Sequence, residues 1–165
     1  MDIKSFVKEF ESVKDKTAFI RKHLKTRYVD YGTKIALCKS IIRQSMYKDV
    51  NGKKMFVIDS PSRYLFFVLT IVSTYVDIEM PVDGVKRMQL IDEIEKYDLM
   101  DSISEALGNE YTKFNALLSV MVEDEINNND LRSMLETKLE TLSLISNQIP
   151  WEKIINHENN SNNKS

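Results

Sequence analysis

The stretch that begins at Ser60-Pro61 constrains the fold of this chain more than any other part of it. Ser is a favoured N-cap residue, and Pro fits the first helical position because its missing N–H would be unpaired there in any case. The residues that follow, up to residue 78, are apolar on nearly every side of a helix. A helix without a polar face has to be covered on most sides. We therefore predict a central apolar helix over residues 61–78.

Amphipathic segments on both sides of this helix indicate an all-α fold. Apolar residues recur at three- and four-residue intervals over residues 2–14, 33–47, 85–97, 110–127 and 131–149, and shorter helical stretches cover residues 16–27 and 101–107. The run from Asn127 to Asp130 is predicted to end one helix and cap the next. Only four Gly and three Pro occur in 165 residues, which disfavours a turn-rich all-β fold. We predict a single-domain bundle of six or seven helices around the central one.

Two segments depart from the helical pattern. Asn51-Gly52 is typical of a tight turn, and residues 54–59 read either as a short strand or as an extended connection. Both interpretations stay open, so the bundle either contains a short β-ribbon near residues 46–58 or lacks one. We assign residues 1–155 to one helical domain. Residues 156–165 contain no apolar side chain and are predicted to form a disordered polar tail.

The net charge of −2 conceals a strong asymmetry along the chain. Residues 1–54 carry 14 Lys and Arg against 6 Asp and Glu, whereas residues 55–165 carry 9 against 19. A bipolar distribution suits head-to-tail self-association, or contact between a basic surface and an acidic partner. It is equally expected of a solvated surface on which charge is unevenly spread.

The basic segment 14–28 is the best candidate for a binding surface. Its cations can neutralise phosphates, and Tyr28 or Tyr31 could stack on an exposed base. Dedicated nucleic-acid-binding domains are usually strongly basic, however, and this chain is slightly acidic. The alternatives are a basic seam against the acidic part of this chain or of a neighbouring subunit, and a solvated face. The residues predicted to contact a partner are Lys16, Arg21, Lys22, Lys25, Arg27 and Tyr28.

The sequence does not indicate a catalytic, metal or cofactor site. Cys38 lies on the apolar side of a predicted helix, where a single Cys usually behaves as a small hydrophobic residue. The acidic run that begins at Asp124 has Ile126 and Asn129 where an EF-hand loop requires an oxygen ligand and Gly. The four glycines stand too far apart to form a phosphate-binding loop. We therefore expect a non-enzymatic protein without cofactor or metal ion.

Neither a signal peptide nor a membrane span is expected. The first residues alternate polar and apolar side chains and lack an apolar core of 7–15 residues. The most apolar stretch, residues 64–76, is shorter than the roughly 20 residues that a membrane-spanning helix needs. A single Cys also suits a reducing compartment. We expect a cytoplasmic protein that does not contact membranes.

Two blocks of the sequence resemble a known group of proteins. The first is Arg-Tyr-Val-Asp-Tyr-Gly-Thr-Lys-Ile-Ala-Leu-Cys at residues 27–38, and the second, within residues 101–124, includes Glu-Tyr-Thr-Lys-Phe-Asn-Ala-Leu-Leu at residues 110–118. These blocks and the abundance of Asn, Lys and Ile resemble small morphogenesis-module proteins encoded by tailed phages of low-GC Gram-positive bacteria. The resemblance implies a virion or morphogenesis protein made in the host cytoplasm. It carries no catalytic motif and therefore transfers no functional residue.

These observations lead to one principal prediction of function and one alternative. The principal prediction is a non-enzymatic helical interaction or assembly protein, a phage virion or morphogenesis component that contacts other virion proteins or itself. Met80, Met100 and Met134 lie near predicted helix ends and are further candidate contacts, because Met side chains adapt to partner surfaces. The alternative is a nucleic-acid-associated regulatory protein that uses the basic segment 14–28.

Overall fold

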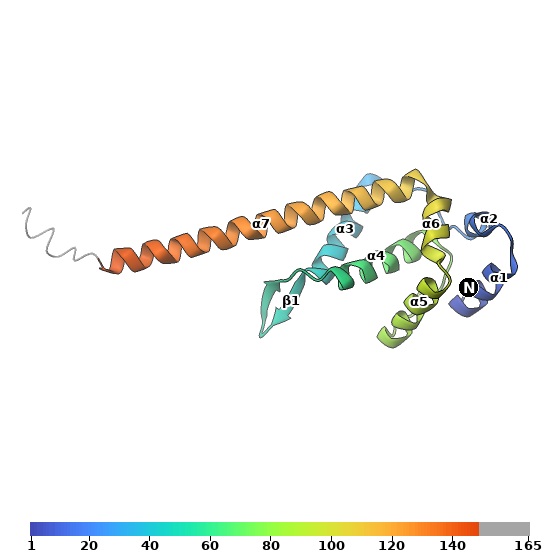
Figure 1. Cartoon of the computed structure of the whole chain (residues 1–165), viewed down its shortest axis with the longest axis horizontal. Helices are drawn as coiled ribbons and strands as arrows, with labels where there is room; N and C mark the ends of the chain where they lie inside the picture. The colour runs from blue at the N-terminus through green and yellow to red at the C-terminus, as the bar shows by residue number, and fades with distance from the viewer. Residues whose placement is uncertain (149–165) are drawn as a thin grey trace, which may run out of the picture. The chain divides into compact units, whose positions relative to one another are not determined.

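The structure, a computed structural model, describes the backbone of residues 1–148 and the side chains of residues 1–144. Within these residues it contains seven helices and one two-stranded antiparallel sheet, which confirms the predicted all-α fold with a short β-ribbon (Figure 1). The elements are α1 (Ile3–Ser12), α2 (Lys16–Lys22), α3 (Tyr31–Ser45), β1 (Tyr47–Val50), β2 (Lys53–Phe56), α4 (Ser60–Tyr75), α5 (Gly84–Lys96), α6 (Leu99–Leu107) and α7 (Asn109–Gln148).

The chain forms two compact units, the first from Met1 to Glu123 and the second beginning at Asp124. The buried apolar residues of the described chain all lie in the first unit, between Phe6 and Leu118. The predicted end of the helical domain at residue 155 and the polar tail at residues 156–165 lie outside the described residues.

Aspartate side chains determine where five of the helices begin. Each accepts a hydrogen bond from the backbone N–H three residues further along the chain, at 2.8–3.1 Å, which satisfies a donor that the helix itself leaves unpaired. These N-caps are Asp2, Asp15, Asp30, Asp59 and Asp83. The N-cap of α4 is therefore Asp59 and not Ser60 as predicted, and α3 begins at Tyr31, two residues before the predicted start, because Asp30 caps it.

Helix α4 forms the centre of the first unit, as the sequence predicts. It contributes more buried residues than any other helix whose burial the structure describes, and it lies between α3 and α5 in Figure 1. The helix ends at Tyr75, three residues before the predicted end. Val76 forms an isolated antiparallel bridge with Leu24, and the backbone N–H of Lys25 donates to the carbonyl oxygen of Tyr75 at 2.8 Å. This long-range backbone pairing draws the chain into an extended conformation after Tyr75.

The two-stranded ribbon connects α3 to α4. Its register pairs Tyr47 with Phe56 and Val50 with Lys53, so the turn between the strands consists of Asn51 and Gly52. Both turn residues have positive φ, 54° and 77° respectively, as a type I′ hairpin turn requires. Asn and Gly adopt this left-handed conformation more readily than other residues. The structure thus contains the β-ribbon, which is one of the two interpretations that the sequence left open for residues 54–59.

The predicted break between residues 127 and 130 does not occur, because α7 runs without interruption from Asn109 to Gln148. Asn and Asp are only moderately unfavourable inside a helix, at less than about 1 kcal/mol each relative to Ala, whereas Gly and Pro are the residues that interrupt helices. The side chain of Asn129 donates to the carbonyl oxygen of Glu125 at 2.8 Å, one turn earlier. The polar run is therefore accommodated within the helix.

Candidate partner-binding surfaces

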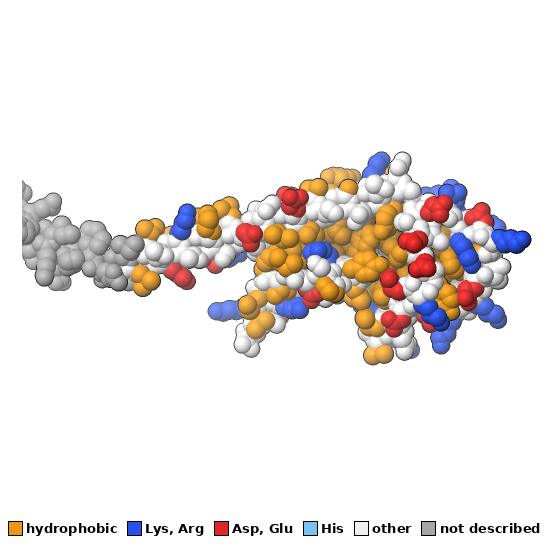
Figure 2. All heavy atoms as spheres, in the orientation of Figure 1, with side chains coloured by type: hydrophobic (Ala, Val, Ile, Leu, Met, Phe, Trp, Pro, Cys, Tyr) orange, Lys and Arg blue, Asp and Glu red, His pale blue; other side chains and the backbone are white. Residues whose placement is uncertain are grey.

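The basic segment 14–28 spans α2 and the loop that follows it. Asp15 caps the start of α2, and Arg21 and Lys22 occupy its last turn, where positive charge is favoured by the helix dipole. Arg21, Lys22, Lys25, Arg27 and Tyr28 are exposed. Figure 2 shows basic and acidic side chains interspersed over the part of the first unit that contains the N-terminal helices. Five of the six predicted contact residues are thus accessible from solvent.

Two of the predicted cations make contacts with their own chain. The amino group of Lys16 donates to the carbonyl oxygen of Phe10 and lies 4.5 Å from the centroid of the Phe10 ring. The amino group of Lys25 donates to the carbonyl oxygen of Ser73 at 3.2 Å. Lys16 is half-buried and joins α1 to α2, so we place it among the structural residues. The sequence could not indicate this role because the contact depends on how the two helices pack.

Arg21, Lys22 and Arg27 form no ion pair with any residue that the structure describes. The predicted seam between the basic segment and the acidic part of the chain is therefore absent at these three positions in the described region. A hydroxyl–carboxylate hydrogen bond of 2.7 Å does join Thr17 of α2 to Glu105 of α6. The three cations remain available to an external anionic surface.

Tyr28 connects this surface to a buried polar cluster. Its side chain is 65% exposed, and the amino group of Lys34 lies 4.9 Å from the centroid of its ring. That amino group also forms an ion pair of 2.8 Å with Glu110, in which both side chains are more than 90% buried. Glu110 further accepts hydrogen bonds from the hydroxyl of Tyr75 at 2.9 Å and from the backbone N–H of Val29 at 3.0 Å.

This cluster, formed by Val29, Lys34, Tyr75 and Glu110, joins a loop, α3, α4 and the start of α7. Burial opposes the ionisation of Glu110, but its donors outweigh burial and hold the pKa of its carboxyl group below the usual value. Burial and the contact with Glu110 raise the pKa of the Tyr75 hydroxyl. Both carboxylate oxygens are occupied by protein donors, so the arrangement suits a structural clamp.

The sequence contained one signal for this clamp. Lys34 lies four residues before Cys38 and therefore on the same side of α3 as the buried Cys38 and Ile41. A charged residue on an apolar helix face usually requires a buried partner of opposite charge. The partner could not be named from the sequence, because Glu110 is 76 residues away and one of 25 acidic residues.

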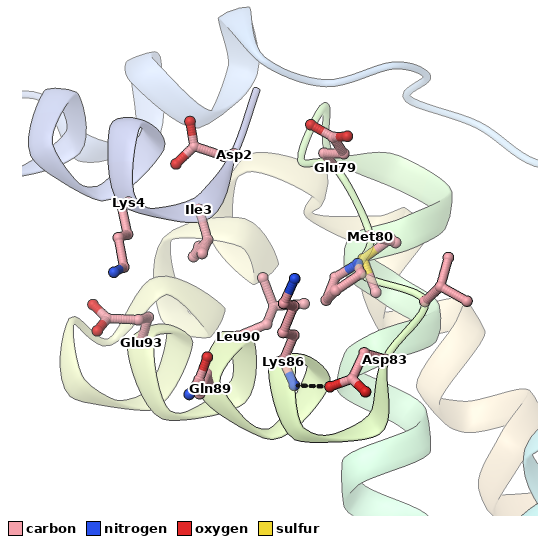
Figure 3. Close-up of a pocket in the computed structure, with 12 residues that line it drawn as sticks. Asp2, Ile3, Lys4, Glu79, Met80, Asp83, Lys86, Gln89, Leu90 and Glu93 are labelled. Atoms are coloured by element: carbon pink, nitrogen blue, oxygen red, sulfur yellow. Dashed lines mark hydrogen bonds between the residues drawn. The ribbon is translucent and has the colours of Figure 1, made fainter.

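A pocket of about 890 Å³ lies between the start of α1 and the segment that leads into α5 (Figure 3). Its lining combines Lys4 and Lys86 with four carboxylates and several apolar side chains. Two of those carboxylates, Asp2 and Asp83, already serve as N-caps, and Figure 3 shows the bond from the backbone of Lys86 to Asp83. The lining carries charges of both signs and does not specify a ligand.

The second half of α7 exposes several large apolar side chains on one side of the helix. Taking 100° of rotation per helical residue, five of its large apolar side chains fall within an arc of roughly 140°. Their exposed fractions range from 47% to 65%. We call this surface the α7 stripe; it consists of Leu131, Met134, Leu135, Leu139 and Leu142. Figure 2 shows apolar side chains along this helix. The apolar spacing over residues 131–149 predicts a helix that packs in the bundle, and Met134 is also a candidate partner contact. In the structure these five side chains are exposed.

Cys38 is fully buried, and burial raises the pKa of its thiol to about 11, so the thiol is a poor nucleophile at neutral pH. Among residues 1–144, no three His, Cys, Asp or Glu side chains are grouped so as to hold a metal ion. No helix within the described part of the chain is both long and apolar enough to cross a membrane.

Comparison of the chain with protein-family models, with curated proteins and with solved structures finds no match.

Proposed function

We propose that this protein is a non-enzymatic interaction or assembly protein that binds a protein partner through the α7 stripe. The observation that carries the proposal is the exposure of five large apolar side chains on one side of a single helix. Burying apolar surface stabilises a complex by about 25 cal/mol per Å², and contiguous exposed apolar patches commonly mark interaction sites. Binding of a partner that buries the α7 stripe would therefore lower the free energy of the system.

The basic segment supports this function in a second way. Arg21, Lys22 and Arg27 are exposed and form no ion pair with described residues, so their charge can attract an acidic partner surface over a distance of about 10 Å at moderate salt. Such steering accelerates association more than it tightens binding. Given the resemblance of residues 27–38 and 101–124 to phage morphogenesis-module proteins, we extend the proposal to virion assembly in the host cytoplasm.

A comparison of tagged full-length proteins in an extract of the producing cells tests the proposal. The stripe variant is Leu135→Glu with Leu142→Glu. The matched control, Ser133→Glu with Thr137→Glu, introduces two carboxylates on the other side of the same helix. We expect the wild-type and control proteins to capture a common protein after cross-linking, and the stripe variant to capture at least tenfold less. Equal capture by all three proteins would show that the stripe is not the binding surface.

A nucleic-acid-associated regulator is the second candidate function. The observation that favours it is the position of Tyr28, which is 65% exposed, close in sequence to three exposed cations. These cations, Arg21, Lys22 and Arg27, form no ion pair with any described residue. If these cations bind phosphates, affinity for a mixed DNA and RNA pool should fall steeply with salt. The variant Arg21→Glu/Lys22→Glu/Arg27→Glu should then abolish binding, and the control Lys39→Glu/Lys53→Glu/Lys54→Glu should retain it. Absence of binding at low salt would eliminate this candidate.

A further inference from the structure

We infer that the α7 stripe pairs with the same segment of a second copy of this chain, and that the two helices run antiparallel. This inference rests on the proposed function, because it names the partner of the surface proposed above. Its basis is the distribution of apolar and charged residues within α7 between residues 124 and 142. This distribution favours antiparallel pairing of the segment with its copy and disfavours parallel pairing.

The segment follows the heptad spacing of coiled coils. From residue 124 to residue 142, positions recur at alternating intervals of four and three residues on one side of the helix. Three of these positions are apolar, namely Leu131, Leu135 and Leu142, and three are polar, namely Asp124, Asn128 and Lys138. Met134 and Leu139 flank the repeat and widen its apolar surface. Two facing helices of this kind can insert their side chains between one another.

A parallel pair would bring like charges together. In a parallel coiled coil each of these positions faces its own counterpart, so Lys138 would face Lys138 and Asp124 would face Asp124. Neither residue has an ion-pair partner within the described chain that could neutralise it. Like charges placed directly opposite one another are destabilising. Two of the six layers would therefore oppose the parallel arrangement.

An antiparallel pair removes this conflict. In the register that places Leu135 against Leu131 of the second copy, the next layer outward places Lys138 against Asn128, and the outermost layer places Leu142 against Asp124. Asp124 lies one helical turn beyond Asn128, within reach of the long Lys138 side chain. The lysine amino group then meets an amide oxygen and a carboxylate, and symmetry provides the same contact twice. Arg132 approaches its counterpart near the twofold axis, but Glu136 already binds it within its own helix at 3.1 Å.

The paired segment covers about 28 Å of helix at 1.5 Å per residue, which corresponds to a short coiled coil. Such an interface is smaller than those of permanent complexes, so we expect dissociation in the micromolar range. The dimer should therefore dissociate on dilution.

A charge-exchange series on the full-length protein tests both the partner and its orientation. Light scattering after size exclusion, over a range of concentrations, should show a dimer that dissociates on dilution. Lys138→Glu alone places a carboxylate one helical turn from Asp124 of the second copy, and Asp124→Lys alone places an amino group one helical turn from Lys138 of the second copy. Each single change should weaken the dimer at least tenfold, and the combination of both should restore it. In a parallel dimer the combined variant would retain both like-charge layers and would not recover.

Disulfide formation tests the register directly. Cys38, the only Cys of the chain, is fully buried and should not interfere. An oxidised mixture of Leu131→Cys and Leu135→Cys proteins should give mixed disulfide dimers, and each protein alone should give few. Efficient cross-linking of Leu135→Cys with itself would indicate parallel helices and overturn the inferred orientation.

The outcomes separate this inference from the proposed function. A chain that is monomeric at all concentrations, but captures another protein in a stripe-dependent manner, would overturn the second copy as partner and leave the proposed function intact. A dimer unaffected by Leu135→Glu/Leu142→Glu would place self-association elsewhere and overturn the inference. A monomer without stripe-dependent capture would overturn both. Unchanged circular dichroism and Tm of each variant exclude loss of folding as the cause.

Discussion

At the scale of single residues, Glu110 is a buried charged group that joins several segments of the fold. Its carboxylate accepts from a buried ammonium group, a phenol and a backbone N–H that come from three different segments of the chain. Removing one member of a buried ion pair is more costly than the pair is stabilising, because the remaining charge stays buried without compensation. Glu110 therefore maintains the arrangement of α3, α4 and the start of α7.

Replacement of Glu110 tests this role. We expect Glu110→Ala to lower the free energy of unfolding by about 3–5 kcal/mol, because it leaves Lys34 buried and unpaired. Urea denaturation measures the change. Glu105→Ala, which removes an exposed carboxylate bonded to Thr17, is the control and should cost about 0.5–1.5 kcal/mol. Equal losses in the two variants would contradict the structural importance of the buried cluster.

The same carboxylate makes stability depend on pH. The folded-state pKa of Glu110 is held below its unfolded value, so at acidic pH the unfolded chain binds more protons than the folded one and stability rises with pH. The contribution is complete above the unfolded pKa and is lost as pH falls through the lowered folded pKa. Asp59 acts in the same direction, since hydrogen bonds from Ser62 and contact with Lys48 lower its pKa to about 2.

We therefore expect the free energy of unfolding to decrease as pH falls from about 5 towards 2, with a shallower slope for Glu110→Gln than for the wild type. Urea titrations at a series of pH values provide the measurement. Identical slopes for the two proteins would show that Glu110 is not held in its charged form by the fold.

At the scale of elements, the chain sets its helix boundaries largely by local chemistry. Five Asp residues cap helices by bonding to backbone N–H groups three residues away, and Gly108 ends α6 with a positive φ of 55°. The Asn51-Gly52 turn sets the register of the ribbon. Each of these features depends on a few neighbouring residues. For this reason the helices were predictable, apart from the break expected between residues 127 and 130, and the Asn-Gly turn was predictable although the ribbon itself stayed open.

Replacement of one cap tests this local control. Asp83→Ala leaves the backbone N–H of Lys86 without its acceptor and should destabilise the first unit by about 1 kcal/mol. Asp83→Ser retains an acceptor oxygen and should cost a few tenths of a kcal/mol. Thermal denaturation compares the two variants. A Ser variant as unstable as the Ala variant would mean that charge, and not capping, is what the first turn of α5 requires.

At the scale of the whole molecule, the buried core and the proposed α7 binding surface lie in different parts of the chain. The buried apolar residues lie between Phe6 and Leu118, and the α7 stripe begins at Leu131. Substitutions in the stripe should therefore alter binding without unfolding the first unit.

Truncation tests this separation. A chain that ends after Glu123 keeps every buried apolar side chain of the described structure, so its Tm should lie close to that of the full-length protein. It should also be monomeric, because it lacks the stripe. Differential scanning calorimetry and light scattering measure the two properties. A truncated chain that no longer unfolds cooperatively would show that residues after 123 contribute to the fold of the first unit.

Features that depend only on neighbours along the chain are legible in the amino-acid sequence. It indicated the fold class, the central helix, the Asn-Gly turn and the basic segment, because periodicity, capping and charge can be read from a few consecutive residues. Tertiary structure alone decided the pairing of Lys34 with Glu110, the inward contact of Lys16 and the exposure of the α7 stripe. These features depend on which distant segments meet, and an apolar pattern states only that a helix face favours burial.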